Sequence, residues 1–348
     1  MQHNTQHTKN MRHSFWLPIW GAVAILCVVI VVGVAVGNVA IPTATVFRII
    51  LAQLGIGTLD VPGSIYSIIM TIRLPRVLLV ALSGAALSAS GAAYQGLFRN
   101  PLADPYIVGV ASGAGFGAIA VVVFGGVMIL GALAMPVGAF IGAFSVVVLV
   151  YGIATQRNQY SNNDLILAGI AIGSLTSALT TYLMIRAGRQ ASQLLAFLLG
   201  SFSSVGWSSV WIVAGAVIIG LSLLMVVSRD LNVLLFTEEQ ARFLGINVPM
   251  IRWFIIVGAT LMTATAVAFH GLIGFVGIIV PHSVRLFFGG DHRKLIPLSA
   301  IYGAVFLVLA DMLARTITAP QELPLGIVTA CCGAPFFLWQ LLTSKRSL

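Results

Sequence analysis

Charged side chains are scarce in this sequence. Asp, Glu, Lys and Arg make up 8% of its 348 residues, whereas a soluble globular domain carries roughly 25%. Hydrophobic residues make up 59% of the chain, so too few polar side chains remain to cover a surface that faces water. These proportions exclude a soluble globular protein and predict an integral membrane protein. The net charge of +9 then requires no nucleic-acid partner, because basic residues also set the orientation of membrane proteins.

The residue patterns of several kinds of active site are also missing. No lysine follows a glycine loop that could cradle a phosphate, because the pattern G-x-x-x-x-G-K-[ST] is absent. Cys27, Cys331 and Cys332 lack the spacing of metal ligands, and we expect them to be packing residues within apolar spans. His270 and His282 have neither an HExxH motif nor a carboxylate cluster, which favours packing histidines over a metal site. We therefore predict no catalytic site, no metal site and no cofactor in this chain.

Long apolar runs dominate the sequence instead. A helix needs about 20 apolar residues to cross a bilayer, and ten stretches qualify, while the alternating pattern of a membrane β-barrel is absent. We predict an all-α fold, a polytopic transmembrane helix bundle of about ten helices. Residues 17–343 would form a single transmembrane domain between short tails at 1–16 and 344–348. The predicted spans are 17–37, 76–95, 106–124, 129–153, 165–187, 210–228, 250–268, 271–288, 295–315 and 324–343.

The distribution of Lys and Arg predicts how this bundle lies in the membrane. Basic residues favour the cytoplasmic side. With the N-terminus inside, all but six of the 18 Lys and Arg residues fall on or near that side. Both tails are then cytoplasmic, and the first span is retained, because it is too long for the core of a signal peptide. The six that fall outside are Arg48, Arg73, Arg76, Arg186, Arg189 and Arg315.

One short cytoplasmic stretch, "FTEEQARFLGINVP" (236–249), holds two of the nine acidic residues. Thr237 can cap a helix while Gln240 reaches back to it, Glu238 and Glu239 face the positive end of the helix dipole, and Gly245 can end the helix. A helix this short is marginal by itself. Two interpretations remain open: it is an ordinary loop helix that packs on its own chain, or it is a docking element for a cytoplasmic partner. Its apolar residues are Ala241, Phe243, Leu244 and Ile246.

Glycines recur four residues apart in several predicted spans, as in Gly109 and Gly113 or Gly138 and Gly142. Small residues at this spacing let helix backbones approach closely in lipid. Asp311 and Arg315 are also four apart, near the outer end of the ninth span, and we expect them to form a structural charge pair.

Several long motifs resemble the FecCD/BtuC-type permeases of ABC importers. They include "RLPRVLLVALSGAALSASGAAYQGLFRNPLADPYIVGVASGAG", "GLIGFVGIIVPHSVRLFFGGDHRKLIP" and "ADMLARTITAPQELPLGIVTACCGAPFFLWQLL", and they extend in order from about residue 72 to 342. The resemblance implies ten transmembrane helices per subunit, a homodimer and a bacterial or archaeal plasma membrane. It also implies two separate cytoplasmic ATPase subunits, which hold the ATP and Mg, and an extracytoplasmic binding protein. The cargo of such permeases is an iron-siderophore, haem or a corrinoid such as cobalamin.

The resemblance assigns roles to particular residues. The loop 229–249 would be the element that couples to the ATPase, through Thr237, Glu238, Glu239, Gln240, Arg242 and Gly245. The loop before the fifth span would be a cytoplasmic gate, at Ser161, Asn162 and Asn163. The fifth span would line a translocation path between two copies, with Ser174, Ser177 and Thr181 on one face. Arginines at the outer side would dock the binding protein, namely Arg73, Arg76 and Arg315.

Two other classes of function are weaker alternatives. An ion-coupled secondary transporter needs intramembrane carboxylates in broken helices, and Asp311 is the candidate. An intramembrane serine protease would use Ser112 with His270 as the base. Dependence of transport on an ATPase partner and ATP separates these classes from the importer.

Overall fold

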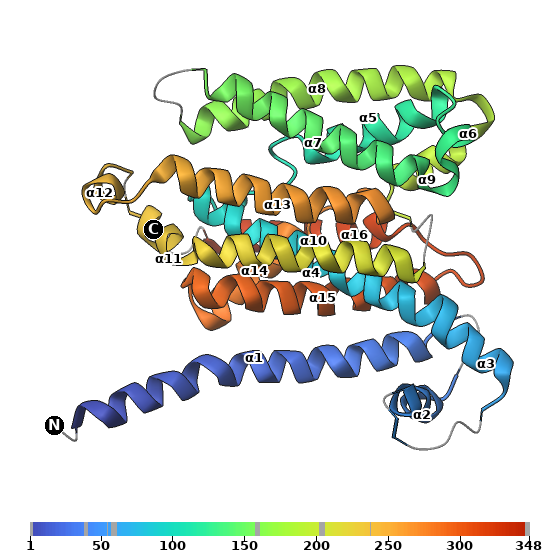
Figure 1. The fold of residues 1–348 in the computed structure, drawn as a ribbon, viewed down its shortest axis with the longest axis horizontal. Coiled ribbons are helices and arrows are strands. Elements are labelled where there is room, and N and C mark those ends of the chain that lie inside the picture. Colours follow the sequence, from blue (N-terminus) through green and yellow to red (C-terminus); the bar gives the residue numbers. More distant parts are fainter. Residues whose placement is uncertain are drawn as a thin grey trace.

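The computed structural model describes residues 3–37, 41–53, 55–56, 61–156, 161–201, 206–236 and 238–344. Every regular element in these ranges is a helix, and the long helices run roughly side by side as one bundle (Figure 1). Seven candidate spans are long and apolar enough to cross a bilayer. The all-α membrane fold expected from composition is confirmed.

Each of the ten predicted spans corresponds to one long helix. They are α1 (His3–Ala35), α4 (Leu74–Leu97), α5 (Val110–Val123), α7 (Ala134–Ala154), α8 (Asn162–Arg186), α10 (Trp207–Val226), α13 (Val248–His270), α14 (Val276–Phe288), α15 (His292–Thr316) and α16 (Leu325–Ser344). Shorter helices connect them: α2 (Thr43–Gln53), α3 (Gly63–Ser67), η1 (Ile68–Arg73), α6 (Val127–Leu130), η2 (Gly131–Leu133), η3 (Gly188–Gln190), α9 (Ala191–Leu198), α11 (Ser228–Leu234) and α12 (Glu238–Phe243). Helix α1 includes most of the segment that was expected to be a tail.

Two predicted spans begin in loops rather than in a helix. Helix α5 begins at Val110 and α14 at Val276, four to five residues later than the apolar pattern indicates. The residues directly before them, Gly109 and Phe275, have φ angles of +88° and +70°. Such left-handed residues do not continue a right-handed helix. The two loops meet inside the bundle, where the hydroxyl of Tyr106 donates to the carbonyl of Ile273 at 3.1 Å.

Glycines bring the helices of the core into backbone contact. A Cβ atom on Gly113 of α5 would lie 2.6 Å from the carbonyl oxygen of Gly142 of α7, and one on Gly84 of α4 would collide with the backbone of Gly303 of α15. The close packing expected at Gly113 and Gly142 is confirmed. Helix α4 is the centre of the bundle, because α10, α13, α14 and α15 all pack against it.

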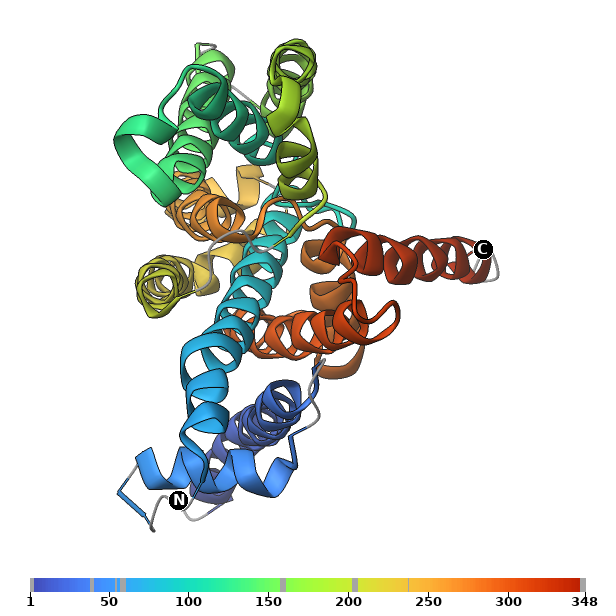
Figure 2. The same cartoon turned by 90° about the vertical axis from the view of Figure 1, so that its right-hand side faces the viewer.

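The bundle has two distinct ends (Figure 1). One end carries α11, α12 and the start of α1, and we call it the α12 end; the opposite end carries α2, α6 and α9, and we call it the α2 end. Helix α16 projects from the body of the bundle, and α8 and α16 border the same side (Figure 2). Helix α1 lies at the edge and packs mainly against α15.

Candidate functional site

Helix α12, the expected coupling element, ends as the sequence predicts. Gly245 adopts φ +79°, its N–H donates to the carbonyl of Arg242 at 2.9 Å, and Ile246 N–H donates to the carbonyl of Ala241 at 3.0 Å. This pair of bonds is a Schellman motif, which closes a helix through a left-handed glycine. Thr237 lies outside the described residues, so its cap with Gln240 stays a prediction.

The apolar residues of this element divide between the two faces. Ala241 is fully buried, whereas Phe243 is 91% and Leu244 is 70% exposed. Phe236, just before the helix, is also exposed, and so is Arg242. Packing on its own chain therefore accounts for Ala241 but not for Phe243 and Leu244. We call these two residues the exposed apolar knob; they lie at the α12 end, outside the predicted spans.

The three residues of the expected gate begin α8 and have different surroundings. The hydroxyl of Ser161 accepts from Asp164 N–H at 3.3 Å, and the Asp164 carboxylate accepts from Ser161 N–H at 2.7 Å. This is a capping box. The amide nitrogen of Asn162 donates to the carbonyl of Leu97 at 2.7 Å, which ties α8 to the end of α4. Asn163 is exposed.

Helix α8 separates two sets of hydroxyl side chains. Thr176 and Thr180 are buried toward α5 and α7, whereas Ser174, Ser177 and Thr181 are exposed. The hydroxyl of Thr181 donates to the carbonyl of Ser177 at 3.0 Å. The three residues expected to share a path face are thus all on the outside of the single chain.

A hollow of about 820 Å³ lies between α16 and the loops that precede α5 and α14. Its lining comes from the start of α5 and the loop before it, the loop before α14, the end of α9 and the first half of α16. It includes Tyr106, Leu198, Phe275, Ala330 and Cys331. All three cysteines are exposed in the single chain, so the expectation that they are packing residues is wrong. An apolar run does not show which side of a helix faces its own chain.

Two of the three expected docking arginines are buried at the α2 end. Arg73 and Arg315 are 8% and 4% exposed. Arg73 donates to the carbonyls of Val34 and Ala35 at 3.1 and 2.9 Å, and Arg315 donates to the carbonyls of residues 33 and 36 at 3.0 and 2.8 Å. The last carbonyls of a helix have no partner within it. These arginines therefore cap the end of α1.

The third arginine, Arg76, reaches the surface and joins a charge network. Its Nη2 lies 3.0 Å from Asp311 Oδ1 and 2.8 Å from Glu322 Oε2. Asp311 is 1% exposed, and its other oxygen lies 2.9 Å from Arg315 Nε. The expected structural pair of Asp311 and Arg315 is confirmed. We call Arg73, Arg76, Asp311, Arg315 and Glu322 the outer charge cluster.

No feature of the sequence marked Glu322 as a member of this cluster. Its partner Arg76 is 246 residues away, and no local spacing links the two. The network also bears on the secondary-transporter alternative, because the carboxylate of Asp311 is already held by two arginines rather than open to an ion.

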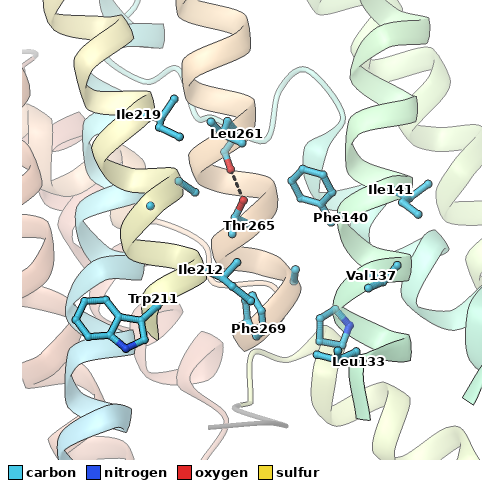
Figure 3. A pocket seen from close by; sticks show the side chains of 14 residues that line it. Leu133, Val137, Phe140, Ile141, Trp211, Ile212, Ile219, Leu261, Thr265 and Phe269 are labelled. Atoms are coloured by element: carbon cyan, nitrogen blue, oxygen red, sulfur yellow. Dashed lines mark hydrogen bonds between the residues drawn. The ribbon is translucent and has the colours of Figure 1, made fainter. Parts of the chain in front are cut away.

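An apolar groove of about 550 Å³ runs between α7, α10 and α13 (Figure 3). Its lining includes Phe140, Trp211 and Phe269, and its one hydroxyl, on Thr265, donates to the carbonyl of Leu261 at 2.6 Å. The groove lies away from the face bordered by α8 and α16 (Figure 2). A surface with so few polar groups suits hydrocarbon, so we do not place a transport path here.

Comparison with known proteins assigns the chain to a family. The FecCD transport family matches residues 25–343. The chain is 41% identical over 324 residues to an uncharacterized ABC transporter permease protein, YvrB, of Bacillus subtilis, and the match covers 92% of each protein. It is 44% identical over 282 residues to the cobalamin import system permease protein BtuC of Halobacterium salinarum, covering 81% of this chain and 75% of that one.

The fold gives the same answer. A solved metal-chelate type ABC transporter in an inward-facing conformation matches with a TM-score of 0.80 at 30% identity, over 94% of this chain and 98% of that one. Sequence and structure agree over nearly the whole length, and the chain belongs to the FecCD transport family.

Proposed function

We propose that this chain is the membrane-spanning permease subunit of an ATP-driven ABC importer. Two copies form the path, two separate cytoplasmic ATPase subunits bind at α12, and an extracytoplasmic binding protein delivers the cargo. The cargo class is a metal chelate, such as an iron-siderophore or haem, or a corrinoid such as cobalamin. The α12 end then faces the cytoplasm of a bacterium or archaeon, together with both ends of the chain.

The observation that carries this proposal is the exposed apolar knob on α12. Exposed apolar groups outside the membrane favour contact with a soluble protein, and aromatic anchors commonly dominate such interfaces. The acidic residues Glu238 and Glu239 then add charge at the start of the same short helix.

Co-purification of the ATPase tests the proposal. We expect Phe243→Ser to lower ATPase recovery by about tenfold or more, since losing an aromatic anchor costs about 2 kcal/mol or more and 1.4 kcal/mol is tenfold in affinity. Met128→Ser is the matched control, because Met128 is 95% exposed but lies on α6 at the opposite end. Equal recovery with both variants would contradict the role of α12.

The exposed face of α8 and the neighbouring hollow support a path between two copies. Its mildly polar hydroxyls, on Ser174, Ser177 and Thr181, suit a large ligand that must not bind tightly. We expect Ser177→Cys to cross-link to its twin across the dimer. Ser222→Cys is the control, because Ser222 is exposed on α10, away from this face. Linking of Ser222→Cys instead of Ser177→Cys would place the interface elsewhere.

At the cytoplasmic end of this path we propose Asn163 as the gate residue, because its side chain is exposed. Ser161 and Asn162 are engaged in bonds that fix the start of α8. We expect Asn163→Ala to raise leakage of small solutes through the reconstituted dimer without changing its thermal stability. An unchanged leak would remove Asn163 from the gate.

Docking of the binding protein is proposed at the α2 end, over the outer charge cluster. Arg76 is its most exposed arginine and lies beside the more exposed Glu322, while Arg73 and Arg315 contribute positive charge from below. Charges at a rim act mainly on the rate of encounter and are screened over about 8 Å at physiological salt. We expect Arg76→Glu to slow association of the binding protein and to flatten its salt dependence. Equal association rates and salt slopes would assign Arg76 to the fold alone.

A further inference from the structure

Asn232 of α11 forms hydrogen bonds to the start of α15. The amide nitrogen of Asn232 donates to Asp291 Oδ1 at 2.7 Å. Its amide oxygen accepts from His292 N–H at 2.9 Å and lies 2.7 Å from His292 Nδ1. Because an amide oxygen only accepts, the Nδ1 atom carries the proton. All three bonds of Asn232 thus end on two consecutive residues.

The joint is partly buried, with Asn232 and Asp291 half-exposed and His292 inside. His292 is 1% exposed, and Leu231 of α11 is fully buried. A Cβ atom on Gly96, at the end of α4, would collide with the His292 ring and lie 3.0 Å from Leu231. The hydrogen bonds to buried His292 favour one geometry, because breaking them leaves a buried polar group without a partner.

The two helices at this joint lead to the two functional ends of the chain. Residues 235–237 alone separate α11 from α12. Helix α15 is continuous from His292 to Thr316, so at 1.5 Å per residue it carries Asp311 and Arg315 about 30 Å from the joint. The outer charge cluster at its far end contacts α1, α4 and the loop before α16 through the bonds described above.

We propose that Asn232 is a positioning residue that transmits movement between α12 and α15, so that the ATPase on one side of the membrane and the binding protein on the other act on one rigid helix. This inference rests on the proposed function, because it requires that α12 be the coupling element. Asn232 is not needed to cap the N-terminus of α15, because Asp291 already caps it: its Oδ1 accepts from Arg293 N–H at 3.1 Å.

The test uses the complete importer, reconstituted with its ATPase and binding protein. The readout is the ratio of ATPase activity with the binding protein to activity without it. We expect Asn232→Ala to leave ATPase co-purification intact and to lower this ratio about fivefold or more, the lower end of typical coupling between distant sites. Ser222→Ala on the preceding helix α10 is the control, since Ser222 is exposed and lies outside the loop 229–249, and it should keep the wild-type ratio.

An exchange of the two side chains separates positioning from simple destabilisation. Asn232→Asp alone removes the donor to Asp291 and places two carboxylates together, so the ratio should fall. Combined with Asp291→Asn, the donor and acceptor are exchanged and the His292 bonds are kept. The cap on Arg293 N–H is lost, because the same Oδ1 atom of Asp291 accepts both bonds, but the ratio should still return to within about twofold of the wild type, which is well below the smallest coupling expected.

Each outcome decides the inference. A normal ratio in Asn232→Ala would overturn it, as would a failure of the exchange to restore the ratio lost in Asn232→Asp. If the wild-type importer shows no ATPase bound at α12, the proposed function fails first. If the ATPase binds and is stimulated but the Asn232 variants behave as the wild type, the proposed function stands and this inference alone falls.

Discussion

Replacing Asp311 with Asn should destabilise this chain more than neutralising any exposed charge. Asp311 is 1% exposed and lies between Arg76 and Arg315. Removing one member of a buried ion pair typically costs 3–5 kcal/mol, because the remaining charge is left without compensation. Here Arg76 keeps Glu322 and Arg315 keeps two carbonyls of α1, so we expect the lower end, about 3 kcal/mol.

Thermal unfolding of the purified protein in detergent measures this effect. Glu322→Gln is the matched comparison, because it neutralises a carboxylate on the same arginine but at a side chain that is 41% exposed. Exposed pairs contribute about 0–1 kcal/mol. The apparent Tm should therefore fall several times further in Asp311→Asn than in Glu322→Gln.

A double variant sharpens the prediction. Adding Arg315→Gln to Asp311→Asn removes the buried positive charge that has lost its carboxylate, and an amide can still donate to the end of α1. The double variant should be more stable than Asp311→Asn alone, which is the non-additivity expected of residues in contact. Equal Tm values for Asp311→Asn and Glu322→Gln, or additive losses in the double variant, would refute the reasoning about burial.

The sequence predicts the helices well because their cause is local. About 20 apolar residues must satisfy their own backbone in lipid, and that requirement can be read from one segment at a time. The same reasoning misplaces the starts of α5 and α14, because loops that are buried in protein can be as apolar as a span. Left-handed backbone at Phe275 has no reliable signal in one sequence.

Contacts across the fold could not be predicted, since they depend on which helices become neighbours. Local spacing predicted the pairing of Asp311 with Arg315, which are four apart on one helix. It could not predict the pairing of Glu322 with Arg76 or of Asn232 with His292, because these partners are far apart in the sequence. It also could not show that Arg73 and Arg315 are turned toward α1, because an arginine at the end of a span fits a surface role and a capping role equally well.

Three further predictions test the packing, the start of α8 and the joint at α15. Gly142→Ala should destabilise the chain by about 1–3 kcal/mol, because the added Cβ meets the backbone of α5. The added Cβ of Gly215→Ala meets open space, so this variant should stabilise α10 by about 0.5–1 kcal/mol. We therefore expect Tm to fall in Gly142→Ala and to rise in Gly215→Ala. Ser161→Ala should cost about 1 kcal/mol through loss of the cap, seen as a lower Tm and faster hydrogen exchange confined to the first turn of α8. Hydrogen bonds from Arg293 lower the pKa of Asp291 to about 2. Because this folded-state pKa lies below the ordinary value of 3.8, the carboxylate stabilises the fold above about pH 4, and that contribution is lost as the pH falls toward 2. Asp291→Asn should therefore show a smaller decline of Tm between pH 4 and pH 2 than the wild type, and parallel declines would show that the ion pair does not form in solution.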